Sequence, residues 1–392
     1  MSIAGPTPRS SRPPRLVLLT GLDLRAYRGG EKYAANLARQ LAARGIQVLL
    51  YSKVDRFERL RLTDAELPAT VGVPFAFYRL FWLPRLPPLP LEPRRFLATL
   101  RGADTIFSLE STPRFVVLIV VLGRLLGRRT VVGLHDPTQV DRLAREVAEP
   151  GPGRWRARLF CLALRHAAAV HTINAAQAAT LRRAGVPDNV AMVHSFTTAE
   201  PVPRAARSSG GFELLFVGPL EREQKGIDLL VEVGRQLLRA RADLRLTIVG
   251  AGRDIGLVEG LVREGAGRVR YRGFVPETEL AGIYAEADAL LLPSRAESFS
   301  LVALEAFTQG VPVVSFDLPG LADVMSVYPE GRAPAFDPAA CTTRVLALYD
   351  LRAREPAAYE RLRAQCRERA IERFGARVQV PKLAEMLGLP LP

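Results

Sequence analysis

The sequence of 392 residues lacks several features that mark particular classes of protein. Its three cysteines, Cys161, Cys341 and Cys366, are widely spaced and form no CxxC pair. A disulfide framework or a zinc knuckle is therefore not expected, and a reducing compartment is favoured. The four histidines form no HExxH or HxxxH pair, and no Asp-x-Asp occurs anywhere, so we expect no metal site and no other cofactor.

The sequence also lacks an apolar run that could cross a bilayer. The longest run, Phe115 to Gly123, is far shorter than the roughly 20 residues of a spanning helix. Residues 1–14 are rich in Pro, Ser and Arg and lack the apolar core of a signal peptide, so they are expected to form a disordered leader. These features predict a cytoplasmic protein that does not span the membrane.

Lysine is scarce although the chain is strongly basic. Of 54 basic residues only four are lysines, and the net charge is +14 with a pI near 10.4. Such a charge predicts an anionic partner, which could be an acidic membrane surface or a phosphate-bearing substrate. No RNP, zinc-finger or basic-zipper pattern is present, so nucleic acid is not the expected partner.

Two halves of the chain show the same alternation of strands and helices. In the first, a buried strand at Arg15–Gly21, a helix at Glu31–Arg44 and a strand at Ile46–Tyr51 form a βαβ start. In the second, a strand at Glu213–Val217 and a helix at Ile227–Arg239 restart the pattern. We therefore predict a leader at 1–14, a first doubly wound domain at 15–200, a linker at 201–211, a second doubly wound domain at 212–370 and a final helix at 371–392. A cleft is expected between the two domains.

Residues 75–101 mix aromatic side chains, arginines and prolines. One interpretation is a Pro-rich crossover that packs on the first domain. The other is an interfacial patch, with aromatics at headgroup depth and arginines on anionic lipid. The second interpretation predicts a protein that is peripheral on the inner face of the plasma membrane.

The most informative stretch runs from Pro293 to Phe307. The pattern predicts a buried strand at Ala287–Leu292, a helix that opens at Glu297, and another strand at Val311–Phe316. The loop before the helix offers backbone N–H groups suited to a phosphate. Glu297 could bind hydroxyls of a sugar, or it could lie in the first helical turn and interact with the helix dipole. Glu305 could bind hydroxyls of a sugar as well, or it could be a solvated helix residue.

Other loops carry residues of the same kind. Lys225, before Gly226 and a helix, is suited to a phosphate, although the segment is no Walker loop. Gly29 and Gly30 lie where a loop enters a helix, where they either form a turn or let the backbone approach a ligand. His135 follows a predicted strand at Thr130–Leu134, so it is either structural or directed at the crevice.

The stretch Pro-Ser-Arg-Ala-Glu-Ser-Phe-Ser-Leu-Val-Ala-Leu-Glu-Ala, followed by Gly-Val-Pro-Val-Val, resembles the donor-binding signature of the retaining glycosyltransferase family 4. The Gly-Gly-x-Glu helix entrance and the Lys225-Gly226 element resemble the same family. The resemblance is strong over about 213–320 and looser before. It implies an α/β protein of the GT-B fold, in which two Rossmann-like βαβ domains face each other across a cleft and the last helix crosses back to the N-terminal domain.

The resemblance also implies roles for particular residues. His135, Glu297 and Lys225 would be catalytic. The donor-binding set would comprise Gly29, Gly30, Arg222, Lys225, Arg295, Glu297, Ser298, Phe299, Ser300, Leu301 and Glu305. Pro219 departs from the family pattern, which has an arginine there for the donor diphosphate. Arg222 or Arg295 is the candidate for the missing charge.

Such an enzyme would move a hexose from a UDP- or GDP-sugar with retention of configuration, without a metal, to a lipid-linked or cell-envelope glycan. No convincing carboxylate nucleophile is evident, which favours front-face transfer over double displacement. Two other classes remain open. An epimerase on the same fold would act without an acceptor, and a non-catalytic protein would bind sugar nucleotide or membrane only.

Overall fold

The computed structural model describes residues 12–20, 29–52, 77–78, 89–90, 93–109, 112–149, 151, 153–186, 189–204 and 211–391. Most of the leader, most of the 75–101 stretch and residues 205–210 of the expected linker lie outside the described residues. The chain divides into two compact units. Unit 1 comprises residues 1–172, 178–193 and 380–392, and unit 2 comprises residues 173–177 and 194–379.

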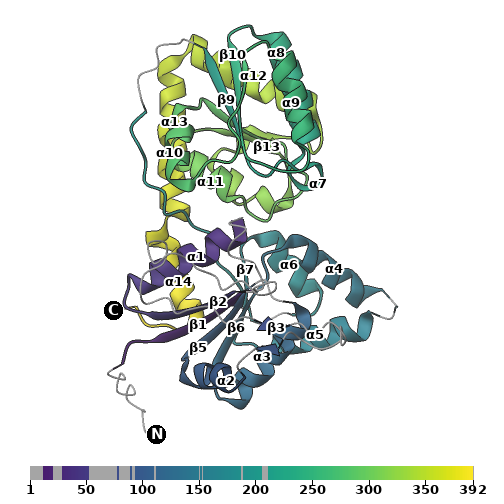
Figure 1. Cartoon of the computed structure of the whole chain (residues 1–392), viewed down its shortest axis with the longest axis vertical. Coiled ribbons are helices and arrows are strands. Elements are labelled where there is room, and N and C mark those ends of the chain that lie inside the picture. The colour runs from purple at the N-terminus through teal and green to yellow at the C-terminus, as the bar shows by residue number, and fades with distance from the viewer. Residues whose placement is uncertain are drawn as a thin grey trace. The chain divides into compact units, whose positions relative to one another are not determined.

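Unit 1 contains a six-stranded parallel sheet in the order β2-β1-β5-β6-β7-β8 (Figure 1). Its strands are β1 (Arg15–Thr20), β2 (Gln47–Ser52), β5 (Thr105–Leu109), β6 (Arg129–Gly133), β7 (Ala169–Thr172) and β8 (Val190–Met192), and β3 (Phe77–Tyr78) pairs antiparallel with β4 (Leu89–Pro90). Its helices are α1 (Gly29–Ala42), α2 (Pro93–Gly102), α3 (Pro113–Leu125), α4 (Pro137–Ala148), α5 (Arg154–His166), and parts of α6 (Ala175–Arg183) and α14 (Ala376–Leu387).

Unit 2 contains a second six-stranded parallel sheet in the order β11-β10-β9-β12-β13-β14. Its strands are β9 (Phe212–Val217), β10 (Leu244–Val249), β11 (Val269–Tyr271), β12 (Ala289–Leu292), β13 (Val313–Phe316) and β14 (Arg332–Ala333). Its helices are α7 (Arg222–Lys225), α8 (Ile227–Ala240), α9 (Ile255–Glu264), α10 (Glu277–Glu286), α11 (Leu301–Thr308), α12 (Pro338–Arg354) and α13 (Pro356–Phe374), and three short 3-10 turns lie at Pro319–Leu321, Val324–Val327 and Pro329–Gly331.

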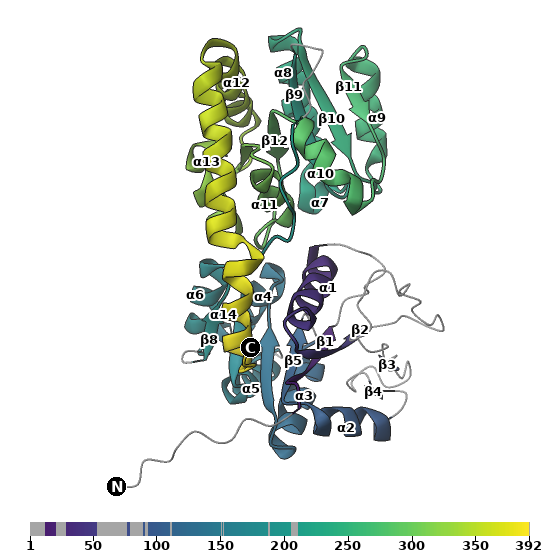
Figure 2. The same cartoon turned by 90° about the vertical axis from the view of Figure 1, so that its left-hand side faces the viewer.

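The strand order of unit 2 fixes where a ligand is expected. Numbered within the unit, the order is 3-2-1-4-5-6, so the direction of winding reverses between β9 and β12, which pair directly. Helices α8 and α9 lie on one side of this sheet and α10 and α13 on the other (Figures 1 and 2). In open sheets of this kind, ligands bind beyond the carboxyl ends of the strands at such a switch point.

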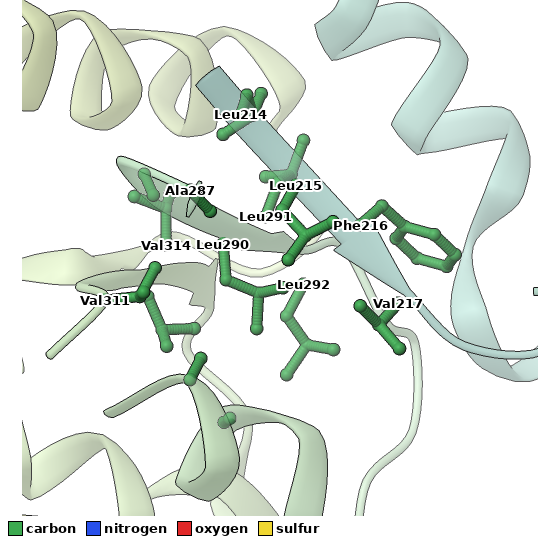
Figure 3. Close-up of a cluster of buried hydrophobic side chains, with 14 of the residues drawn as sticks. Leu214, Leu215, Phe216, Val217, Ala287, Leu290, Leu291, Leu292, Val311 and Val314 are labelled. Carbon is green, nitrogen blue, oxygen red and sulfur yellow. The ribbon is translucent and has the colours of Figure 1, made fainter. Parts of the chain in front are cut away.

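The buried strands account for the stability of unit 2. Leu214, Leu215, Leu290, Leu291 and Leu292 are all at most 1% exposed, and they cluster with other apolar side chains of the neighbouring strands and the segments that lead into them (Figure 3). A strand that is buried on both faces has a continuous apolar sequence, as Leu214–Val217 of β9 and Ala289–Leu292 of β12 have. Burial of each such side chain contributes about 1.5–3 kcal/mol. This core holds the two strand ends in fixed positions.

The predicted fold class is confirmed, since each unit is a doubly wound parallel sheet with helices. Two of these local predictions were wrong. The helix of the key stretch begins at Leu301 rather than at Glu297, and α1 begins at Gly29 rather than at residue 31. Helices α2, α4, α5, α7, α9 and α12 were not predicted. None of the helices in the described part of the chain is long and apolar enough to span a membrane.

Candidate functional site

A buried ion pair joins the two loops at the switch point of unit 2. Lys225 Nζ, at the end of the short helix α7 that follows β9, donates to Glu297 Oε1, in the loop after β12, over 2.6 Å. Ser294 Oγ donates to the same oxygen over 2.8 Å. No described residue donates a hydrogen bond to Oε2. The lysine and glutamate side chains are only 12% and 6% exposed, so solvent screens their interaction little.

The two loops approach closely because residue 226 is a glycine. Gly226 has φ +63°, and a Cβ there would lie 2.1 Å from the carbonyl oxygen of Pro293. The Arg295 N–H donates to the Gln224 carbonyl over 2.8 Å, which ties the loops together beside the ion pair. Only glycine adopts this backbone without a clash. In the Lys225-Gly226 element the glycine therefore permits the close approach of the two segments, and the lysine supplies the charge that pairs with Glu297.

The two arginines that were candidates for the missing charge are both held by aspartates. Arg295 donates to Asp228 over 2.6 and 2.8 Å, and to the Arg222 carbonyl over 2.8 Å. Arg222 donates through Nε to Asp254 over 3.0 Å. The hydrogen bond from Arg295 lowers the pKa of Asp228, and the bonds from Arg222 lower the pKa of Asp254. Arg222 is the more exposed of the two arginines.

The residues after Glu297 form a fixed turn before α11. Ser300 has φ +70° and ψ +93°, which is unusual for a non-glycine residue, and its Oγ caps α11 by accepting from the Ala303 N–H over 3.3 Å. The Asn174 side-chain amide donates to the Ser298 carbonyl over 2.5 Å. The main chain at 298–300 is therefore held from both ends.

Phe299 contributes to this turn through its backbone alone. Its side chain is 2% exposed and packs against Phe374 and His194, with ring centroids 5.3 and 5.9 Å away. Leu301 is the first residue of α11 and is half-buried. Together these positions present main-chain N–H groups at a helix start, which is a favourable place for an anion.

Neither glutamate has the purely structural role that was the alternative to sugar binding, namely a helix-dipole partner for Glu297 and a solvated helix residue for Glu305. Glu297 precedes the turn rather than lying in the first turn of a helix, so it is no dipole partner of that kind. Glu305 lies within α11, is 8% exposed, and accepts a hydrogen bond from Tyr284 Oη over 3.1 Å. It is therefore not a solvated helix residue. Two carboxylates that are kept buried in one loop-and-helix unit require polar partners.

In unit 1, His135 lies two residues beyond β6 and is bound to a second histidine. His135 Nε2 lies 2.9 Å from His171 Nδ1, and His171 Nε2 lies 2.9 Å from the Val193 carbonyl oxygen. The carbonyl can only accept, so His171 carries its proton on Nε2 and accepts at Nδ1. His135 then donates from Nε2, and its Nδ1 is an acceptor.

The environment of His135 keeps the ring neutral. Burial, and secondly the charge of His171, lower the pKa of His135 well below its ordinary value of 6.5. Tyr33 of α1 packs edge-on against the imidazole with a centroid distance of 5.0 Å. Gly29 and Gly30 are the first two residues of the same helix. Residues 21–28 before them, including Tyr27 and Arg28 of the predicted loop, lie outside the described residues.

Sequence reasoning missed three residues that support the site. Asn174 fixes the turn at Ser298, His171 fixes the tautomer of His135, and Asp323 accepts from the Ala175 N–H over 2.9 Å. The His194 imidazole, whose Nε2 lies 3.6 Å from Asp323 Oδ2, and that N–H lower the pKa of Asp323. Asn174 lies between β7 and α6, and its place at a strand-to-helix junction is the one signal that the sequence offered. Within the described ranges no group of three His, Cys, Asp or Glu side chains could hold a metal ion.

Solved structures identify the fold. Sucrose-phosphate synthase from Thermosynechococcus elongatus matches over 95% of this chain and 98% of its own, with a TM-score of 0.67 at 20% identity. HepE of Anabaena in complex with UDP matches over 95% and 99%, with a TM-score of 0.69 at 16% identity, and it has also been solved with UDP-glucose. The chain shares the fold of these two structures, the GT-B fold.

Sequence comparisons then give the family. The model of the glycosyl transferases group 1 matches residues 211–350, and that of the glycosyl transferase 4-like domain matches residues 28–195. The chain belongs to this family of glycosyltransferases, and the resemblance drawn from the sequence is confirmed.

The curated relatives match over less than half of this chain. Glycogen synthase of Mycobacterium tuberculosis is 34% identical over 177 residues, which is 44% of this chain and 42% of that protein. D-inositol 3-phosphate glycosyltransferase 1 of Catenulispora acidiphila is 39% identical over 140 residues, 32% of this chain and 33% of that protein. The chain thus spans less than half the length of these relatives.

Proposed function

We propose that this chain is a retaining hexosyltransferase that uses a UDP- or GDP-sugar. The observation that carries the proposal is the Lys225–Glu297 pair at the switch point of unit 2, beside the N–H groups of residues 298–300. A cation and free N–H groups suit a diphosphate, and a carboxylate with one oxygen not engaged by a described residue suits a sugar hydroxyl. The UDP and UDP-glucose complexes of HepE, a protein of the same fold, support a sugar nucleotide as the donor.

In this proposal the residues of unit 2 stabilise the departing diphosphate. The bond between the sugar anomeric carbon and the diphosphate oxygen breaks, and the acceptor oxygen bonds to the same face of that carbon. The acceptor proton passes to the diphosphate. Lys225 and the main chain of residues 298–300 balance the charge that develops on the leaving group. Glu297 binds sugar hydroxyls and Glu305 binds the ribose.

Several details of the proposal rest on the sequence. Arg222, which is exposed and held by one aspartate, is the better candidate for the charge that Pro219 does not supply. The absence of Asp-x-Asp supports transfer without a metal bridge to the diphosphate. The lack of an evident nucleophile supports front-face transfer. Gly29, Gly30 and His135 of unit 1 complete the proposed set.

For the acceptor we propose a lipid-linked or cell-envelope glycan, reached at the cytoplasmic face of the plasma membrane. The net charge of +14 supports an anionic surface as a partner. This part of the proposal is independent of the donor site.

A donor screen tests the proposed activity. The protein is incubated with UDP- and GDP-hexoses and a lipid extract, and nucleotide release is followed alongside the Glu297→Gln variant. Release that needs both the extract and Glu297 is expected. Release without any acceptor would indicate an epimerase instead. If no donor is bound or consumed, a binding protein whose diphosphate site is disabled by Pro219 becomes the better interpretation.

A further inference from the structure

Helices α3 and α5 of unit 1 pack side by side and share one core. Val116 and Val120 of α3 lie in the same buried cluster as Ala157, Phe160 and Leu164 of α5. The two helices therefore belong to one layer on the sheet (Figure 1). Side chains on the face of each helix opposite its buried face therefore lie on the outer surface of that layer.

Both helices carry large apolar side chains on this outer surface. On α5 these are Trp155, Leu159 and Leu162, at positions i, i+4 and i+7, which is the spacing of one helical stripe, and they are 60%, 45% and 49% exposed. On α3 they are Val121 and Leu125, at i and i+4, with Leu125 77% exposed. Five of the nine large exposed apolar side chains among the described residues thus lie on these two helices. A clustered set of this kind marks an interaction surface.

The charged side chains on the two helices themselves have one sign. Arg156, Arg158 and Arg165 of α5 and Arg114 and Arg124 of α3 are exposed, and neither helix contains an acidic residue. Arg156 also lies over the Trp155 ring at 5.2 Å. The neighbouring α4 carries Asp141 and Glu146 as well as Arg142 and Arg145, so it adds no strong field of either sign.

We propose that the α3–α5 surface binds an anionic lipid bilayer. Apolar side chains enter the interface between headgroups and acyl chains, tryptophan prefers that depth, and arginines extend to the phosphates. A protein partner of ordinary charge would not match so uniform a ring of arginines. The side chains of this surface belong to α3 and α5 and are not among residues 75–101. It deepens the acceptor part of the proposed function, since it would hold the enzyme where lipid-linked acceptors lie.

Trp155 provides a direct reporter for this proposal. It is one of only two tryptophans, so the Trp82→Phe variant emits from Trp155 alone. Vesicles of phosphatidylcholine, with and without phosphatidylglycerol, are added to this variant without donor or acceptor. We expect a blue shift of emission with the anionic vesicles only, and loss of the shift as NaCl is raised. No shift with anionic vesicles would overturn the proposal and leave the donor screen unaffected.

Flotation with anionic vesicles then tests the residues. Leu159→Ser/Leu162→Ser and, separately, Arg156→Gln/Arg158→Gln/Arg165→Gln should each weaken vesicle affinity by at least about tenfold. The matched controls in unit 2, Phe274→Ser and Arg263→Gln/Arg270→Gln/Arg272→Gln, remove exposed side chains of the same kinds and should bind as wild type. Equal loss in the controls would mean that net charge alone acts. If the wild type forms dimers that dissociate in Leu159→Ser/Leu162→Ser, and if it does not bind vesicles, the surface is a contact between copies of the chain. Either result overturns the proposal.

Discussion

Lys225 and Glu297 are 72 positions apart in the sequence, and their side chains meet at 2.6 Å where the winding of the second sheet reverses. The relationship depends on the direct pairing of β9 and β12, which brings the loops after these strands together. Because both side chains are largely buried, each depends on the other for compensation of its charge.

Breaking this pair from one side should destabilise unit 2 more than removing it altogether. Lys225→Met leaves a buried carboxylate without its cation, and we expect a loss of about 3 kcal/mol. Lys225→Met/Glu297→Gln removes both charges and should recover part of that loss. Urea unfolding of the single and double variants measures the coupling. Additive losses would show that the two side chains do not interact.

Gly226→Ala should destabilise the chain strongly. The new Cβ would meet the Pro293 carbonyl at 2.1 Å, and the left-handed backbone adds strain. Together these effects should cost about 2–4 kcal/mol and lower Tm by roughly 6 °C or more. Gly256→Ala in α9 is the control, since a Cβ at that position would have no other atom within 4 Å and alanine favours a helix. Equal Tm values for the two variants would contradict the tight approach of the loops.

Ser300 should show an unusual order of stability. Ser300→Ala loses the cap of α11 while keeping the positive φ, and should cost about 1 kcal/mol. Ser300→Gly also loses the side chain, but glycine accepts this φ and a glycine cap costs only a few tenths of a kcal/mol. Thermal unfolding should therefore place the glycine variant above the alanine variant. The reverse order would mean that the backbone at 300 is not strained.

The histidine pair predicts a pH dependence of stability in unit 1. The pKa of His135 is lowered in the folded state, so below about pH 6.5 the unfolded chain binds a proton that the folded chain does not. Stability is thus full above pH 6.5 and falls as the pH drops below it, by up to about 1.4 kcal/mol per pH unit. Urea unfolding between pH 7.5 and pH 5 should show a shallower slope for His135→Gln than for wild type. Identical slopes would contradict a buried neutral ring.

Much of the fold could be predicted from the sequence, because strands such as Ala289–Leu292 are continuous apolar runs with turn signals at their ends. The start of α11 could not, because Ser298–Ser300 would suit a first helical turn as well. Tertiary contacts decide the matter there: Asn174 holds the Ser298 carbonyl from another segment. Likewise, the spacing of His135 and His171 in the sequence does not predict the hydrogen bond between their rings, because it is the pairing of β6 with β7 that brings the two residues together.

The most direct test of the proposed donor site is the binding of donor measured by calorimetry. Wild type, Lys225→Met, Glu297→Gln and the control Lys382→Met are titrated with the sugar nucleotide that the screen selects. We predict that Lys382→Met binds as wild type and that the two site variants lose at least about tenfold in affinity, as expected for charge-assisted hydrogen bonds of about 1.5–3 kcal/mol. If all four proteins bind the donor equally well, the donor does not lie at the Lys225–Glu297 pair and the proposed site is wrong.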